Sequence, residues 1–363
     1  MPWTPEDYAD HFEDKGKRPS RKERKILSEK DRSKYKKTDL EKKQQLPIEP
    51  NQAHVRGRVV SIKSDGIIVD LNDTLYLCTL RGLFKKDKSL QKSLIAVGDI
   101  VHVLITDPGE GCIMHIESRY SHLSRSETLS QKKQQILAAN IDQVIITASI
   151  VAPTLKPSLI DRYLIAAQKG NMQPIIVINK IDLLDQADAD EQTIYHEVCK
   201  CYSQLGFPLL PISTQTGQGI DELKALMKDK TSVFSGQSGV GKSSLINATL
   251  GTDLATGDVT DRTRKGMHTT TSAELIPLPG GGFVVDTPGI KSFGIWEIEL
   301  EDVRLYFPDL HALSHNCQYP NCSHLHEPGC AVKNALENGE LSALRYDSYC
   351  ALMTSIAEKH KPR

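Results

Sequence analysis

Runs of aliphatic residues alternate with helical segments between about residues 120 and 300. Each run is short and continuously apolar, as is typical of parallel strands buried on both faces, and helical periodicity follows it. The pattern predicts an α/β domain whose parallel sheet is covered by helices on both sides. The expected strands lie in DQVIITASI, QPIIVINK, PLLPIS, TSVFSG and GFVVDTPG, and the expected helices lie at 157–170, 192–205 and 220–227 and after Lys242.

A different pattern covers residues 52–119, where short segments alternate apolar and polar residues between turns such as Ser64-Asp65-Gly66. This alternation is typical of strands with one buried face. Five such strands in about 70 residues predict a small closed barrel of the OB type, and an SH3-like barrel with the same periodicity stays open as an alternative. The expected strands are VRGRVVSI, DGIIVDL, LYLCTL, DIVHVLI and CIMHIES.

The composition is that of an ordinary globular protein, since 39% of the 363 residues are apolar and 25% are charged. The 45 Lys and Arg residues nearly balance the 46 Asp and Glu residues, which excludes a globally basic nucleic-acid binder. No apolar run reaches the ~20 residues of a membrane helix, and the acidic N-terminus lacks the apolar core of a signal peptide. We expect a cytoplasmic protein with no membrane partner, whose eight cysteines are metal ligands or core residues rather than disulfides.

Residues 1–50 contain few aliphatic side chains, so we expect a charged, disordered extension. Within it, residues 1–14 carry five acids and no Lys or Arg, whereas residues 15–43 carry fourteen Lys and Arg against five Asp and Glu. Two interpretations stay open for the basic stretch: a solvated tail, or an arm that contacts RNA phosphates.

The strongest motif is GQSGVGKS, which fits the phosphate-binding pattern G-x-x-x-x-G-K-[ST] between an expected strand and an expected helix. Its glycines allow backbone N–H groups to surround phosphate oxygens, and the helix N-terminus favours negative charge. Lys242 is expected to reach the β- and γ-phosphates as a catalytic group, and the Ser243 hydroxyl is expected to bind Mg²⁺. The expected nucleotide-binding residues of this segment are Gly236, Gln237, Ser238, Gly239, Val240, Gly241, Lys242, Ser243 and Ser244.

The segment DTPG ends an expected strand about forty residues after the phosphate loop. Asp286 is therefore placed to hold Mg²⁺ through water, and the N–H of Gly289 is placed to sense the γ-phosphate.

The segment NKID follows another expected strand and is suited to read guanine. The Asp182 carboxylate can accept hydrogen bonds from N1–H and the exocyclic amine of guanine, which adenine does not present in that arrangement. Asn179 is expected at N7 and the Lys180 stem against the base or ribose. The loop STQTGQG, which begins at Ser213, is expected to contact the guanine oxygen. Together these motifs predict a site for GTP rather than ATP.

The order of the motifs differs from that of ordinary GTPases, in which the phosphate loop comes first. Here NKID and STQTGQG precede GQSGVGKS, and DTPG comes last. The same sheet is assembled if the original termini are joined and the chain is opened after DTPG, which is a circular permutation. The chain leaving DTPG then leads directly into the C-terminal tail.

The tail contains the pattern Cys317-x4-Cys322-x-His324-x5-Cys330, with three thiolates and one imidazole in fourteen residues. Four N and S ligands are what a structural, tetrahedral Zn²⁺ requires, and His326 is a competing imidazole. Basic and aromatic residues near the cluster are expected on a helical surface, with RNA contact as the alternative: Lys333, Arg345, Tyr346 and Tyr349.

The permuted motifs, the barrel and the Cys/His cluster together resemble the bacterial ribosome small-subunit-dependent GTPase family, RsgA/YjeQ, over residues 52–350. The resemblance implies an OB-fold at 51–119, a circularly permuted P-loop GTPase domain at 120–300 and a mostly helical zinc-binding domain at 301–363. The implied activity is GTP hydrolysis by a late assembly and maturation checkpoint factor of the 30S subunit, with hydrolysis stimulated by the subunit and coupled to release.

The segment GMHTTT resembles the switch I of this family, in which Thr269 or Thr270 binds Mg²⁺. Spacing does not choose between them, and a Thr-rich strand opening is the alternative. Ile290 occupies the place where many GTPases carry a Gln that orients the attacking water, so we expect slow intrinsic hydrolysis. By resemblance His268 is the candidate for that role, with an exposed loop residue as the alternative, and the family pattern favours His324 as the zinc ligand.

The expected cofactors are GTP or GDP, Mg²⁺ and one structural Zn²⁺. The expected partner is the 30S ribosomal subunit, with its 16S rRNA and nearby proteins, bound by a monomer. The alternative function is a non-catalytic RNA-binding factor in which GTP is a structural ligand, and Ile290 gives it some support.

Overall fold

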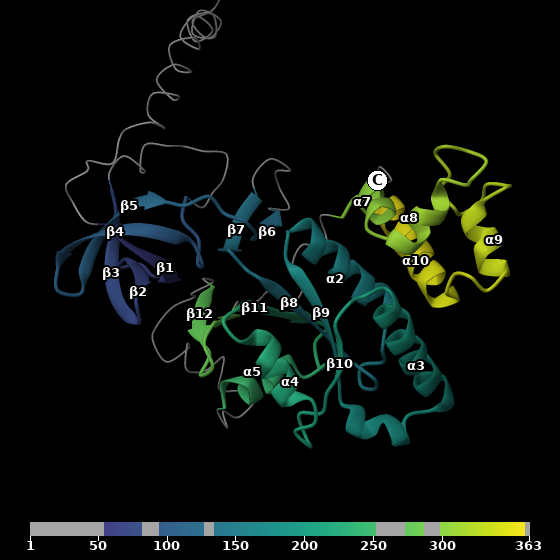
Figure 1. The fold of residues 1–363 in the computed structure, drawn as a ribbon, viewed down its shortest axis with the longest axis horizontal. Helices are drawn as coiled ribbons and strands as arrows, with labels where there is room; N and C mark the ends of the chain where they lie inside the picture. Colours follow the sequence, from purple (N-terminus) through teal and green to yellow (C-terminus); the bar gives the residue numbers. More distant parts are fainter. Residues whose placement is uncertain (1–53, 82–93, 127–133, 252–272, 287–297, 360–363) are drawn as a thin grey trace, which may run out of the picture. The chain divides into compact units, whose positions relative to one another are not determined.

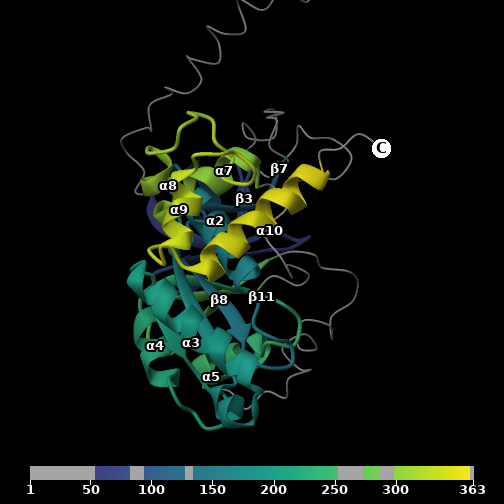
Figure 2. The same cartoon turned by 90° about the vertical axis from the view of Figure 1, so that its right-hand side faces the viewer.

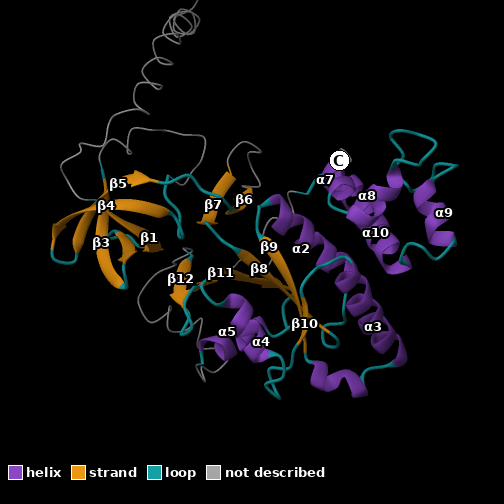
Figure 3. Cartoon of the chain, viewed as in Figure 1, coloured by secondary structure: helices purple, strands orange, loops and turns teal. Residues whose placement is uncertain are grey.

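The computed structural model describes most of the unit His54–Arg363 (Figure 1), namely residues 54–81, 94–126, 134–251, 273–286 and 298–359. These residues form a β-barrel, an α/β domain and a mostly helical C-terminal part, which confirms the fold class predicted from the sequence (Figure 3). Some predictions lie outside the described residues: those for residues 1–50, His268, Thr269, Thr270, Gly289 and Ile290.

The N-terminal barrel has the strand order β1-β2-β3-β5-β4, and pairing between β4 and β1 closes it. β3 and β5 are parallel, and all other neighbouring strands are antiparallel. Alternate residues point inwards, as in β2, where Ile67, Val69 and Leu71 are buried. This order is that of an OB-type barrel. The strands are β1 (Val55–Ile62), β2 (Ile67–Leu71), β3 (Thr74–Leu80), β4 (Ile100–Asp107) and β5 (Glu110–Ile116).

The α/β domain has the strand order β10-β9-β8-β11-β13-β12, in which every neighbouring pair is parallel except β13 and β12. The side chains of successive residues in β8 lie on opposite faces of the sheet. Ile146 packs with α2 and α3, and Ile145 packs with α4 and α5. Helices therefore cover both faces of the sheet, as predicted. The strands are β8 (Gln143–Ser149), β9 (Gln173–Asn179), β10 (Leu209–Pro211), β11 (Thr231–Gly236), β12 (Glu274–Pro277) and β13 (Phe283–Asp286). The helices are α2 (Pro157–Lys169), η3 (Ile181–Gln186), α3 (Ala189–Gln204), α4 (Ile220–Met227) and α5 (Lys242–Leu250).

Two features of this region were not predicted. A hairpin of β6 (His122–Ser126) and β7 (Gln134–Ala139) precedes the sheet. The last strand of the domain, β12, is antiparallel to β13, and its Glu274 pairs with Ser61 of β1. This pairing joins barrel and α/β domain into one eleven-stranded sheet.

The C-terminal part consists of α7 (Leu300–Leu305), α8 (Pro308–Ser314), α9 (Ala331–Glu337) and α10 (Ala343–Lys359). These helices share a hydrophobic cluster that also includes Ile165 of α2, and α10 lies beside α2 (Figures 1 and 2). Among the helices described, none combines the length and hydropathy needed to cross a membrane.

Candidate nucleotide site and metal centre

The predicted nucleotide-binding residues emerge at one edge of the parallel sheet. β11 ends at Gly236, β9 ends at Asn179 and β13 ends at Asp286, while Ser213 lies two residues after β10. These strands are parallel members of the same sheet, so their carboxyl ends lie at the same edge, where α/β proteins bind ligands. The permuted motif order thus brings together the segments that ordinary GTPases bring together in another order.

The phosphate loop requires glycine at both of its ends. Gly236 and Gly241 have φ angles of +148° and +94°. A Cβ atom on Gly236 would lie 2.1 Å from the carbonyl oxygen of Thr147, and one on Gly241 would lie 2.3 Å from Nδ2 of Asn179. The loop therefore lies directly against the ends of β8 and β9.

Lys242 begins α5 and braces this loop. Its Nζ donates hydrogen bonds to the carbonyl oxygens of Gly236, at 2.9 Å, and Gln237, at 2.5 Å. Ser243 and Ser244 lie in the first turn of α5, whose unpaired backbone N–H groups favour an anion. In the middle of the loop, Ser238 and Gly239 are exposed to solvent, whereas Val240 is buried.

Asn179 connects the guanine-reading segment with the phosphate loop. Its side chain is buried, Nδ2 donates to the carbonyl oxygen of Val240 at 2.9 Å, and Oδ1 accepts from the N–H of Thr214 at 3.3 Å. The sequence assigned Asn179 to the base alone and missed this link, because neither partner is near it in sequence. Lys180 has a left-handed backbone conformation, and its Nζ donates to the carbonyl oxygen of Ala152.

Asp182 lies in η3 and is oriented by Ser213. The Ser213 hydroxyl donates to Oδ1 of Asp182 at 2.5 Å and accepts from the N–H groups of Gln215, at 3.2 Å, and Thr216, at 3.1 Å. Ser213 therefore shapes the loop STQTGQG and holds the carboxylate at once. Within the described part of the chain, no protein hydrogen bond engages Oδ2 of Asp182.

Asp286 lies at the end of β13, beside the strand that leads into the phosphate loop. Burial raises the pKa of its carboxyl group, and the negative charge of Glu274, its cross-strand partner on β12, raises this pKa further. A cation beside such a carboxylate favours its charged form, so the environment of Asp286 suits a ligand of Mg²⁺, directly or through water.

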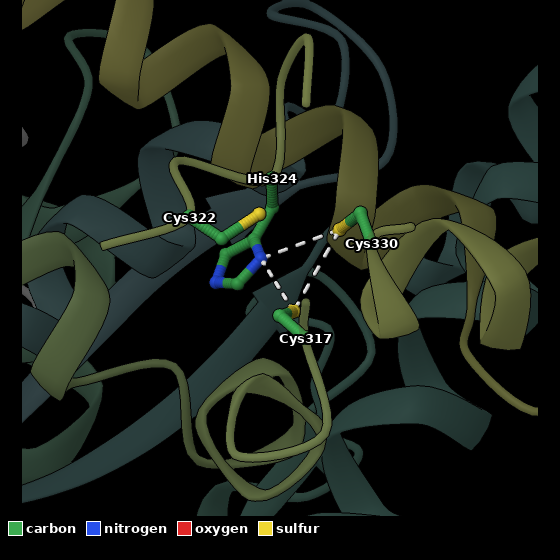
Figure 4. A group of neighbouring side chains, drawn as sticks. All are labelled: Cys317, Cys322, His324 and Cys330. Carbon is green, nitrogen blue, oxygen red and sulfur yellow. Dashed lines mark hydrogen bonds between the residues drawn. The ribbon is translucent and has the colours of Figure 1, made fainter. Parts of the chain in front are cut away.

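The four predicted zinc ligands converge in the C-terminal part (Figure 4). Nδ1 of His324 lies 3.6 Å from Sγ of Cys317 and 3.4 Å from Sγ of Cys330, and these two sulfur atoms are 4.0 Å apart. All four ligand atoms, including Sγ of Cys322, lie within 4.8 Å of one another. A tetrahedral Zn²⁺ with ordinary bond lengths separates S from N by about 3.6 Å and S from S by about 3.8 Å. The donor set and its spacing therefore fit zinc, with no ligand position left open.

The carboxylate of Glu327 stabilises the loop between the zinc ligands. The Glu327 carboxylate accepts hydrogen bonds from the N–H and hydroxyl of Ser323 and from the N–H of His326. The hydrogen bond from the Ser323 backbone is the main reason that the pKa of Glu327 lies well below its usual range. His324, not His326, contributes its ring to the cluster.

Two residues near the cluster contradict the surface position expected for them. Arg345 is 2% exposed and Tyr349 is 0% exposed. The guanidinium of Arg345 is paired with carboxylates of Asp161 and Asp309, so a charged residue became part of the interior. The prediction for Arg345 was wrong because both carboxylates are distant in sequence, and Tyr349 is buried in the hydrophobic cluster of the C-terminal part.

Comparisons with known proteins agree with this architecture. A family profile described as RsgA GTPase matches residues 116–296. The small ribosomal subunit biogenesis GTPase RsgA of Bacteroides fragilis strain YCH46 is 38% identical over 288 residues, covering 79% of this chain and 92% of the relative. The protein of the same name from Chlorobaculum tepidum is 39% identical over 313 residues, covering 83% and 98%.

Two solved structures are also similar. The crystal structure of YjeQ from Thermotoga maritima has a TM-score of 0.66 at 35% identity and covers 84% of this chain and 99% of that chain. YloQ, described as a circularly permuted GTPase, has a TM-score of 0.66 at 31% identity and covers 87% and 99%.

Proposed function

Since this chain belongs to the RsgA GTPase family, we propose that it hydrolyses GTP on the small (30S) ribosomal subunit as a factor in the late assembly of that subunit. The observation that carries the proposal is the pair of hydrogen bonds made by Asn179. One joins the guanine-reading segment to Val240 in the phosphate loop, and the other joins it to Thr214 in the loop STQTGQG. A single nucleotide can then meet both segments at one edge of the sheet.

In this proposal Asp182 reads the guanine base, with Ser213 holding its carboxylate, and Asn179 and Lys180 contact the base and ribose side. Specificity for guanine follows because the Asp182 carboxylate would lose its two hydrogen-bond donors if it faced adenine. The glycine-rich segment from Gly236 to Ser244 surrounds the phosphates with backbone N–H groups.

During hydrolysis, the oxygen of water bonds to the γ-phosphorus while the bond to the β–γ bridging oxygen breaks, which releases GDP and phosphate. Lys242 places a positive charge where negative charge gathers on the phosphate oxygens. Ser243 and Asp286 would hold Mg²⁺, which would neutralise charge on the same oxygens, and Thr269 or Thr270 would supply a further ligand. Gly289 senses the γ-phosphate, and His268 takes the place of the missing glutamine at Ile290.

The Cys/His cluster holds a structural zinc ion that stabilises the C-terminal part, because four protein ligands leave no position for substrate. The OB-type barrel and the zinc-bearing part are the surfaces that meet the subunit, and the protein acts in the cytoplasm, where ribosomes assemble.

Sedimentation with purified 30S subunits tests the proposal. Coupling of hydrolysis to release predicts that the protein sediments with 30S subunits in the presence of a non-hydrolysable GTP analogue and dissociates in the presence of GDP. With 50S subunits neither nucleotide should retain it. Equal retention on 30S subunits with both nucleotides would contradict the coupling and favour a non-catalytic RNA-binding factor.

A further inference from the structure

Helix α2 carries two buried polar side chains that face different parts of the protein. Asp161 and Tyr163 are two residues apart, which places them about 200° apart around a helix. Both are nearly inaccessible to solvent, at 1% and 2% exposed. One side of α2 therefore meets the C-terminal part, and the other meets the sheet.

On the first side, Asp161 is held by a network from two helices. Its carboxylate accepts from the hydroxyl of Tyr202 on α3, at 2.9 Å, and from Arg345 and Ser348 on α10. Nε and Nη2 of Arg345 also donate to the two carboxylate oxygens of Asp309, at 2.9 Å and 3.0 Å. Separating α10 from α2 would break the contacts of Asp161 with Arg345 and Ser348, so this network ties the position of α10 to that of α2.

The same turn of α10 braces the metal centre. The hydroxyl of Tyr346 donates to the carbonyl oxygen of His324 at 2.8 Å, and that of Tyr349 donates to the carbonyl oxygen of Ser323 at 3.0 Å. These tyrosines directly follow Arg345 and Ser348 in the chain. One helical turn thus contacts the loop of zinc ligands on one side and α2 on the other.

On its second side, α2 packs against the start of the phosphate loop. Burial raises the pKa of Tyr163, while hydrogen bonding with the Gly236 backbone lowers it. Tyr163 also lines a small cavity together with Gln237 and Val240 of the loop. The carbonyl oxygen of Gly236 also accepts a hydrogen bond from Lys242. Tyr163 and Lys242 therefore both contact the backbone of Gly236.

We propose that α2 transmits the position of the zinc-bearing part to the phosphate loop, with Tyr163 as a positioning residue for Gly236 and Arg345 as the residue that holds α2 in place. The inference rests on the proposed function, because it takes this loop to bind the phosphates of a guanine nucleotide. Whatever displaces α10, such as contact with an RNA or protein surface, would then change the affinity for the β- and γ-phosphates.

The test uses full-length, zinc-loaded protein and fluorescent methylanthraniloyl-GDP, with GMP as a competitor. Loss of one hydrogen bond in Tyr163→Phe should weaken GDP binding roughly two- to tenfold. The affinity for GMP should not change, since GMP lacks the β-phosphate at the loop. Arg345→Met should also weaken GDP binding while the zinc content stays at the wild-type level.

The double variant distinguishes coupling from two separate effects. If Arg345 acts through Tyr163, then Tyr163→Phe combined with Arg345→Met should weaken GDP binding no more than the stronger single variant. The matched control is Lys169→Ala, which removes the exposed ion pair from α2 to Asp302 of α7 and should change GDP affinity less than twofold. If Arg345→Met does not fold, Ser348→Ala takes its place in the comparison, because this variant removes only one hydrogen-bond donor to Asp161.

Unchanged GDP affinity in Tyr163→Phe would overturn the inference, as would multiplying losses in the double variant. An equal loss of GDP and GMP affinity would indicate general damage to the site and would overturn it as well. Failure of the wild-type protein to bind the fluorescent GDP would contradict the proposed function itself, whereas wild-type binding with unaffected variants contradicts only the coupling.

Discussion

Replacing Asp182 with Asn should change which base the site accepts. Ser213 donates to Oδ1 of Asp182 at 2.5 Å, and the other carboxylate oxygen is available to the N1–H and amine of guanine. In Asp182→Asn, an amide that still accepts from Ser213 turns its NH₂ group towards these donors. Two donor groups then face each other, and both hydrogen bonds to the base are lost.

The size of the effect follows from the number of hydrogen bonds. A hydrogen bond to a charged group contributes about 1.5–3 kcal/mol, so the loss of two amounts to about 3–6 kcal/mol. This corresponds to a loss of roughly 10²- to 10⁴-fold in GDP affinity. Xanthine carries a carbonyl where guanine carries its amine, and it accepts from the new NH₂ group. The variant should therefore prefer XDP over GDP.

Titration with the methylanthraniloyl derivatives of GDP and XDP measures both affinities. Asp185→Asn is the matched control, because this residue is an exposed aspartate in the same short helix and should leave both affinities unchanged. A folded Asp182→Asn variant that binds GDP as tightly as the wild type would refute the assignment of Asp182 to the guanine base.

Three further predictions concern the phosphate loop and the C-terminal part. Gly241→Ala should weaken GDP binding at least about tenfold, because its Cβ would lie 2.3 Å from the side chain of Asn179, and titration with the same probe measures this. Cys330→Ser should lower the zinc content measured by metal analysis and destabilise the C-terminal part towards urea, and wild-type zinc content would argue against the ligand set. Arg345→Met should cost about 3–5 kcal/mol in urea unfolding, since it leaves the buried carboxylate of Asp161 without its ion-pair partner. Lys169→Ala should cost at most about 1 kcal/mol, and similar costs for the two variants would contradict the network.

Local patterns in the sequence were sufficient for most elements of the fold. Helix α4 was predicted at the residues where it occurs, 220–227, and the barrel strands were predicted from their alternation. The motifs also indicated where each strand ends, because a buried run followed by polar, glycine-rich residues has little other interpretation. The parallel order then followed from the alternation of strands and helices.

Other features depend on contacts that no local pattern contains. β12 has only four residues and pairs both with β13 and with the barrel. β6 is short and rich in polar residues, and its partner β7 begins with two glutamines. Arg345 was expected at the surface because it is charged, yet its partner Asp161 lies 184 residues earlier in the chain. Burial of a charge is favourable only with a partner, and the sequence does not show which partner folding supplies.

The most direct test of the proposed activity is the rate of phosphate release from GTP with and without purified 30S subunits, with 50S subunits and ATP as controls. The family assignment and the site predict slow hydrolysis by the isolated protein, stimulation by 30S subunits alone, no hydrolysis of ATP, and loss of the stimulated rate in Lys242→Ala. Tight GTP binding without any stimulation by 30S subunits would contradict the proposed function.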